Sequence, residues 1–181
     1  QAGEVYTVYN QYLKRYTACQ VAYIAPPDTV SKESWAVVLS LDWVGDAPLT
    51  AEELPHLRPL YKDFMYWPRD LHPLRVPVEI PPQYTLVGTL PPFTDQPCRS
   101  YGGWNDGYEV YRQIKWQEIP EERRRAFKEA MESDGEPEIG GIPVKVSSHR
   151  LMDKYLPFGS ARELEALPCL SDLICERWHP D

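Results

Sequence analysis

The sequence lacks any apolar run long enough to cross a membrane. Its longest apolar stretch extends from Trp35 to Leu41 and already contains Ser40, whereas a membrane-spanning helix needs about 20 consecutive apolar residues. We therefore expect no transmembrane segment in this chain.

Basic residues are scarce compared with acidic ones. The 19 Lys and Arg residues stand against 27 Asp and Glu residues, which gives a formal net charge of -8. Proteins that bind nucleic acids need clustered Lys and Arg side chains to displace counterions. The one basic run, Arg123 to Arg125, follows Glu121 and Glu122 and is typical of a solvated helix face. The charge balance argues against a nucleic-acid partner and favours attraction to a protein with a basic surface.

The cysteines are few, and their spacing is not that of a metal site. Cys19, Cys98, Cys169 and Cys175 include no CxxC pair and have no histidine at zinc-binding spacing, so we expect no metal and no cofactor. An even set of cysteines could form two disulfides. Because the chain also begins at Gln1 rather than Met, we expect a periplasmic or secreted protein. A cytoplasmic protein with reduced, buried cysteines is the alternative.

The composition is that of a folded protein. With 181 residues, 43% hydrophobic residues, 12 Tyr and 6 Trp, the chain can bury a sizeable core, and we expect one domain over residues 1–181. From Glu4, apolar residues recur with the period of a helix as far as Tyr16, which predicts an N-terminal helix.

Three further segments have the character of strands. Residues 35–44 are rich in β-branched and aromatic residues and predict a central strand. Residues 76–80 and 84–90 are extended segments between prolines. Residues 108–116 alternate with the period of a half-buried strand, and Asp106-Gly107 before them predicts a hairpin turn.

Short helices complete the predicted fold. Thr50 to Glu53 is a capping box that opens a helix toward Leu60 or Met65. A surface helix is predicted from Ile119 to about Ser133, a short strand over 142–146, and a terminal helical segment from Ser160. The predicted fold is α+β: a mostly antiparallel sheet, an N-terminal helix, several short helices and long Pro-rich loops.

Two segments concentrate aromatic side chains where a partner could contact them. The three glycines within residues 102–107 do not lie between a strand and a helix in this prediction, so the segment does not resemble a phosphate-binding loop. Aromatic and amide side chains on exposed loops make good contact anchors. The candidate partner-binding residues are Tyr101, Trp104, Asn105 and Tyr108, together with Tyr66 and Trp67.

Sequence motifs for catalysis are missing. No two of the four histidines have the spacing of a metal-ligand pair, and no G-x-S-x-G nucleophile motif is present. We therefore expect a non-catalytic protein-binding protein, by analogy an immunity-type inhibitor that covers the surface of a basic toxin or hydrolase. The alternative is a hydrolase or carbohydrate-active protein whose acidic and histidine residues lie beside aromatic loops. Its candidate residues are Asp63, Asp70, His72 and Glu109.

Overall fold

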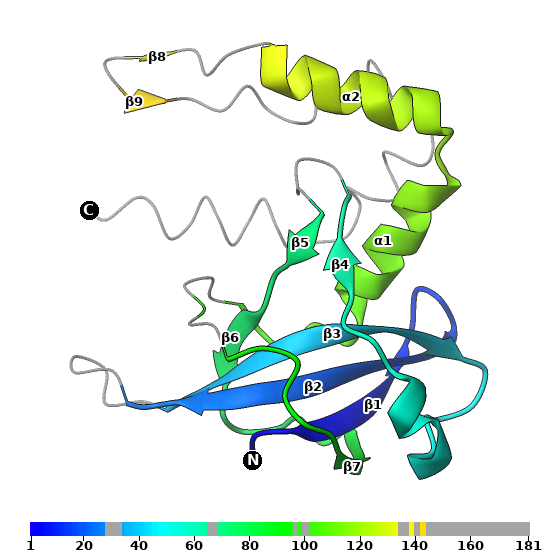
Figure 1. Ribbon diagram of the computed structural model, residues 1–181, viewed down its shortest axis with the longest axis vertical. Helices are drawn as coiled ribbons and strands as arrows, with labels where there is room; N and C mark the ends of the chain where they lie inside the picture. The colour runs from blue at the N-terminus through cyan, green and yellow to red at the C-terminus, as the bar shows by residue number, and fades with distance from the viewer. Residues whose placement is uncertain are drawn as a thin grey trace. The chain divides into compact units, whose positions relative to one another are not determined.

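The computed structural model describes residues 1–27, 34–64, 69–95, 98, 102–133, 138–139 and 142–143 (Figure 1). The chain divides into two compact units. The first comprises Gln1–Asp63 and Trp67–Gln113, and the second comprises Phe64–Tyr66 and Ile114–Asp181. The single domain over residues 1–181 stays a prediction, and the two units are described separately below.

The first unit is built on an antiparallel five-stranded sheet. Its strands are β1 (Glu4–Asn10), β2 (Arg15–Ala25), β3 (Trp35–Gly45), β6 (Leu74–Pro77) and β7 (Thr85–Thr89). Their order across the sheet is β6-β3-β2-β1-β7, and each neighbouring pair is antiparallel (Figure 1). The predicted antiparallel sheet and the strand over 35–44 are confirmed.

The predicted N-terminal helix is wrong, because residues 4–25 form the β1–β2 hairpin. Every residue from Val5 to Tyr9 is β-branched or aromatic, and such residues favour a pleated strand over a helix. The chain then turns at Asn10, whose Oδ1 accepts hydrogen bonds from the backbone N–H groups of Tyr12 and Leu13. Lys14 completes the turn with a positive φ of 54°.

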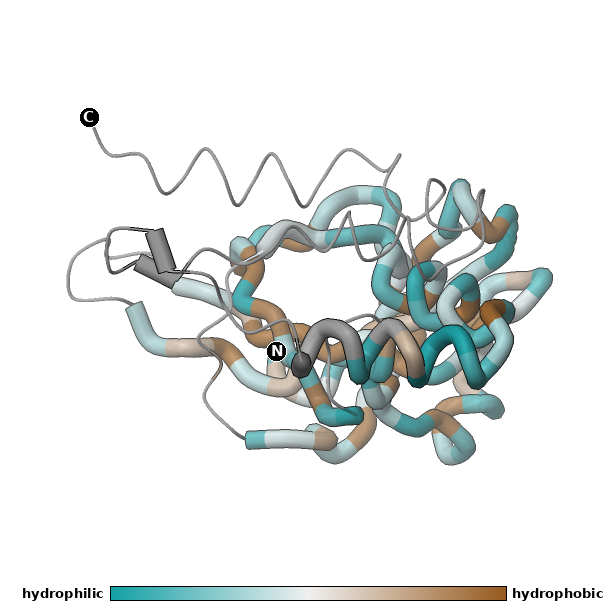
Figure 2. Tube along the Cα trace, turned by 90° about the horizontal axis from the view of Figure 1, so that it is seen from above, coloured by the Kyte–Doolittle hydropathy of each residue, from teal (hydrophilic) through white to brown (hydrophobic). Residues whose placement is uncertain are grey.

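Both faces of the sheet are covered by apolar side chains. Tyr6, Val8, Cys19 and Val21 pack with Val76 and Tyr84 on one face. The residues that alternate with them face the opposite side, where Val5, Ala18 and Leu41 pack against Leu49, Leu54 and Leu57. Figure 2 colours the chain by hydropathy, and short hydrophobic (brown) and hydrophilic (teal) stretches follow one another along it.

Short elements connect the strands of this sheet. The capping box at Thr50 and Glu53 is confirmed, but the 3-10 helix η1 (Ala51–His56) contains Pro55 and is shorter than predicted. A two-stranded hairpin follows, β4 (Tyr61–Lys62) with β5 (Asp70–Leu71). Of the two predicted extended segments, 84–90 is confirmed as β7, whereas 76–80 overlaps only the end of β6.

The predicted hairpin turn and strand after Asp106 are wrong, because helix α1 (Tyr108–Glu118) forms there. Gly107 has a φ of +75°, and a Cβ at this position would lie 1.9 Å from Thr17 Oγ1. Asn105 Oδ1 accepts the Gly107 N–H, and the Asn105 carbonyl accepts the Tyr108 N–H. The same positive φ that favours a hairpin therefore turns the chain into a helix.

The second unit contains helix α2 (Glu121–Ser133) and a short hairpin, β8 (Glu138–Ile139) with β9 (Ile142–Pro143). Helix α2 confirms the predicted surface helix, and the N–H groups of Arg123 and Arg124 in its first turn donate to the Pro120 carbonyl. The strand predicted over 142–146 is present at residues 142–143. The predicted terminal segment from Ser160 lies outside the described residues.

Candidate functional site

Trp104 and Asn105 help to build the entry to α1. The Trp104 indole is half-buried, its Nε1 donates to the Pro77 carbonyl at 3.0 Å, and its ring packs edge-on against Tyr84 with centroids 4.9 Å apart. Asn105 orders the turn before the helix through Gly107. The side chains of Trp104 and Asn105 therefore both contact other residues of this chain. Tyr66, Trp67 and Tyr101 lie outside the described residues.

Tyr108 belongs to a group of three tyrosines whose rings pack together. Its ring lies 6.2 Å from that of Tyr111 and 5.9 Å from that of Tyr12, and the Tyr12 and Tyr111 rings are 5.4 Å apart. The Arg112 guanidinium lies 5.5 Å from the Tyr108 ring centroid, within cation–π range. We call Tyr12, Tyr108 and Tyr111 the tyrosine patch. Tyr111 is buried, Tyr108 is half-buried and Tyr12 is 42% exposed.

The tyrosine patch joins two segments that are far apart in the sequence. Tyr12 lies in the turn between β1 and β2, whereas Tyr108 and Tyr111 lie in the first turns of α1. Asn10 connects the two segments, because its Nδ2 donates to the Asp106 carbonyl at 2.9 Å while its Oδ1 orders the turn. The backbone on both sides of the patch is therefore fixed by hydrogen bonds.

A second aromatic pair lies at the same end of the β1–β2 hairpin. Tyr9 and Tyr16 are opposite each other in the register, and their rings pack edge-to-face at 5.3 Å. Tyr9 is 49% exposed. Next to this pair, Arg15 Nε donates to Asp46 Oδ1 at 2.7 Å. Sequence reasoning missed Tyr9, Tyr12 and Tyr16 because it assigned them to one face of a helix.

The candidate acidic and histidine residues gather where β4 and β5 meet α1. Lys62 Nζ lies 2.5 Å from Glu109 Oε1, and Ser40 Oγ donates to the other carboxylate oxygen, Oε2, at 3.3 Å. The Lys62 side chain is 2% exposed and that of Glu109 is 13% exposed. Because both oxygens of Glu109 are engaged, this carboxylate is suited to hold structure rather than to accept a proton from a substrate.

The charges of this ion pair act on His72, which directly follows strand β5. Burial lowers the pKa of His72 from its ordinary value of 6.5, and the positive charge of Lys62 lowers it further, whereas Asp70 and Glu109 act in the opposite direction. Asp63 enters the group through its backbone, because its N–H donates to Gln113 Oε1 at 2.8 Å. The burial of Lys62 could not be read from the sequence, since lysine is rarely buried unless it is paired.

A pocket lies between the sheet and the segment before α1. Its lining includes Cys19, Ser40, Tyr84 and Trp104, and its free volume of about 20 Å³ is little more than one water molecule requires. Burial raises the pKa of the Cys19 thiol to about 12, with a further contribution from the negative charge of Asp106. The thiol therefore stays protonated at neutral pH and is a poor nucleophile.

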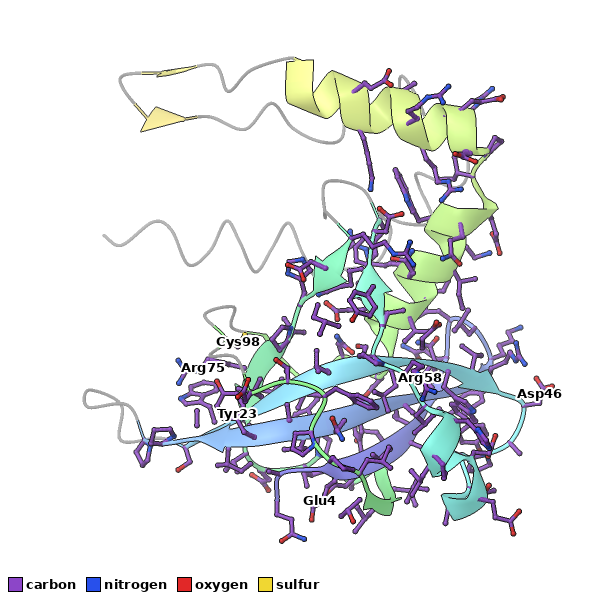
Figure 3. All side chains as sticks on the ribbon, in the orientation of Figure 1. Glu4, Tyr23, Asp46, Arg58, Arg75 and Cys98 are labelled. Atoms are coloured by element: carbon purple, nitrogen blue, oxygen red, sulfur yellow. The ribbon has the colours of Figure 1, made fainter. Side chains whose placement is uncertain are left out.

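The other described cysteine is also buried. Cys98 donates its thiol to the Pro73 carbonyl and its N–H to Tyr23 Oη, and Figure 3 shows Cys98 near Tyr23 and Arg75, with Asp46 at the opposite end of the sheet. Cys169 and Cys175 lie outside the described residues, so the disulfides stay a prediction.

The described residues contain neither a metal-binding cluster nor a membrane-spanning helix. Among these residues, no three His, Cys, Asp or Glu side chains are grouped so that they could hold a metal ion. None of the helices in the described ranges is both long and apolar enough to span a membrane.

Comparisons of this chain with known proteins found no match. No protein-family model, no curated protein and no solved structure matches it. The tyrosine patch, the buried ion pair and the charge of the chain are therefore the observations that bear on function.

Proposed function

We propose that this chain is a non-catalytic protein-binding protein, specifically an immunity-type inhibitor that neutralises a basic toxin or hydrolase by covering its surface. The observation that carries the proposal is Tyr12, a 42% exposed aromatic ring that packs against Tyr108 and Tyr111 on a hydrogen-bonded turn. Exposed tyrosines held in this way are well suited to anchor a protein interface.

The pre-ordering of Tyr12 supports binding. Tyrosine has few rotatable bonds, and its backbone in this chain is already fixed by Asn10. Little further conformational entropy is therefore lost when a partner covers the ring, so more of the contact energy contributes to affinity. Tyr108, a candidate from the sequence, lies at the half-buried edge of the same patch.

The net charge supports the chemistry proposed for the partner. At a net charge of -8, long-range attraction accelerates encounters with a basic protein, and salt screens this attraction. Such a role fits a periplasmic or secreted protein that meets a toxin outside the cytoplasm.

The alternative enzymatic function has less support. Its candidate Glu109 is committed to Lys62 and Ser40. The pocket that contains Ser40 is the size of a water molecule rather than of a substrate. Neither feature supplies the open acid–base pair that a hydrolase requires.

Affinity capture from the native extract at two salt concentrations tests the proposal. The purified chain serves as bait and mass spectrometry identifies the retained proteins. We expect one basic protein, retained in stoichiometric amount at low salt and weakened at high salt. No stoichiometric partner at either salt concentration would contradict the proposal and direct attention to substrates that bind near Asp70 and His72.

A further inference from the structure

The two edge strands of the five-stranded sheet differ in how they are protected. Proteins keep an edge strand from pairing with another chain by means of charges, prolines or a covering segment. Strand β6 has a charge and a proline, since it contains Arg75 and ends at Pro77. The segment before α1 also covers it: the Gly102 N–H donates to the Arg75 carbonyl, and Trp104 Nε1 donates to the Pro77 carbonyl. The β6 edge is therefore protected.

The other edge strand, β7, lacks both the charge and the proline. Its five residues are Thr, Leu, Val, Gly and Thr. Within the described residues, β1 is the only strand that pairs with β7. Backbone groups along a strand point alternately to its two sides, so β7 also directs N–H and C=O groups away from β1. These groups can pair with a further strand.

An exposed leucine lies on the same edge. Leu86 is 53% exposed, a larger fraction than for any other large apolar residue in the described ranges. Its neighbour Val87 instead packs with the cluster that contains Leu54 and Leu57. Strand β7 therefore offers an apolar side chain as well as backbone groups, and cross-strand side-chain contacts stabilise a sheet.

The charge distribution indicates which strand fits this edge. Residues 80–94, which include β7, contain no Asp, Glu, Lys or Arg and form the longest such segment of the chain. A basic strand would gain no attraction from this segment. A second copy of the chain is repelled by the net charge of -8, but its own β7 brings no charge to the contact. A neutral strand of the same kind is therefore the best match.

We propose that β7 pairs antiparallel with β7 of a second copy, so that two five-stranded sheets join into one across a twofold axis. Antiparallel pairing of a strand with its own copy is self-complementary, because each copy supplies the same donors and acceptors to the other. In a register centred on the strand, the two Leu86 side chains lie on the same face of the joined sheet, opposite or diagonal to each other. This dimer is independent of the partner binding proposed above.

The contact between the two copies is short, so the dimer should be weak. Strand β7 has five residues, and its register with β1 shifts between Val5 and Tyr6, an irregularity that increases the local twist. Interfaces that bury little surface give weak complexes. Because salt screens the repulsion between two acidic copies, the dimer should strengthen as the salt concentration rises. Binding of a basic partner has the opposite salt dependence.

Analytical ultracentrifugation of the purified full chain tests the dimer. Over a range from about 1 µM to about 1 mM, which covers weak association, the measured mass should rise from that of a monomer toward that of a dimer. The rise should be larger at high salt. Hydrogen exchange at the β7 amides should become slower as the protein concentration increases, because their outward N–H groups gain acceptors.

Two lysine variants that change the net charge equally show where the copies meet. Leu86→Lys places a charge on the edge strand and should weaken the dimer at least about tenfold. Val78→Lys is the matched control, because Val78 is 46% exposed and lies outside β7, and it should dimerise like the wild-type chain. Unchanged melting temperatures would show that both variants are folded.

Three outcomes would overturn the proposed dimer. They are a monomer mass at every concentration and salt, a dimer that forms without slower exchange in β7, and equal dimerisation of the wild-type and Leu86→Lys chains. The first two need only the wild-type chain, so poor folding of a variant does not remove the test. Failure of the dimer leaves the proposed function open, because capture of a basic partner does not depend on β7.

Discussion

At the scale of single residues, Tyr12 and Glu109 differ in burial, and we therefore assign Tyr12 to binding and Glu109 to stability. Tyr12 is exposed and held by two rings, so its removal affects a surface more than the core. Glu109 is nearly buried and held by Lys62 and Ser40, so its removal takes the neighbouring carboxylate away from the buried charge of Lys62. The two residues therefore call for different measurements.

Removing one member of the Lys62–Glu109 pair should destabilise the fold strongly, whereas replacing both members with apolar residues should destabilise it little. Lys62→Met alone leaves the carboxylate of Glu109 without its countercharge, and we expect a loss of about 3–5 kcal/mol in the free energy of unfolding. Lys62→Met combined with Glu109→Leu should recover most of that loss, because no buried charge is left. Urea denaturation of the two single variants and the double variant measures the cycle. If the loss in the double variant equals the sum of the two single losses, the interaction between Lys62 and Glu109 does not account for the destabilisation.

Cys19 should resist alkylation in the folded chain. Burial raises the pKa of its thiol to about 12, so almost none of it is thiolate at neutral pH, and thiolate is the reactive form. Peptide mapping after brief treatment with iodoacetamide should find Cys19 unmodified in native protein and modified after unfolding in denaturant. Rapid labelling of native Cys19 would mean that the sheet does not enclose it as described.

At the scale of elements, the sequence correctly predicts the helices and strands whose residue preferences agree with their tertiary environment. The strand over 35–44, the capping box at Thr50 and helix α2 were found because residue preference, capping residues and burial point the same way. Residues 4–16 and 108–116 were assigned wrongly because their apolar spacing fits both a helix and a strand. Contacts with distant residues determine which structure forms. Residues 4–10 form a strand that pairs with β2, and Thr17 lies against Gly107 at the start of α1.

The candidate site was predictable only in part for the same reason. Tyr108 was found as an aromatic residue after a glycine-rich segment. Tyr12 was missed because its place beside Tyr108 depends on the Asn10–Asp106 hydrogen bond, which joins positions 96 residues apart. The sequence does contain a local signal for the turn, since an asparagine that follows a β-branched and aromatic run favours a turn.

Gly107 is the position where the entry to α1 is most sensitive. Gly107→Ala places a Cβ 1.9 Å from Thr17 Oγ1 at a φ of +75°, and we expect it to destabilise the fold by about 2 kcal/mol or more. Gly103→Ala is the matched control, because a Cβ there meets nothing within 4 Å. Thermal unfolding of both variants should show a clear drop in Tm only for Gly107→Ala. Equal effects would contradict the described helix entry.

At the scale of the whole molecule, charge and shape act at different distances. The net charge of -8 attracts a basic partner over the Debye length of about 10 Å and so increases the rate of association. The tyrosine patch interacts with the partner only on contact, so it affects the rate of dissociation. Salt should therefore slow association with a basic partner, while substitution of Tyr12 should speed dissociation. Kinetic binding measurements on the captured partner would separate the two effects.

The most direct test of the proposed binding surface is affinity capture with three baits in parallel: the wild-type chain, Tyr12→Ala and Tyr61→Ala. Tyr61 is the matched control, because it is 48% exposed compared with 42% for Tyr12 and lies outside the patch. Unchanged melting temperatures would show that both variants are folded. We predict that Tyr61→Ala retains the same partner as the wild-type chain, whereas Tyr12→Ala retains it with at least about tenfold lower affinity. Equal retention by all three baits would contradict the assignment of partner binding to the tyrosine patch.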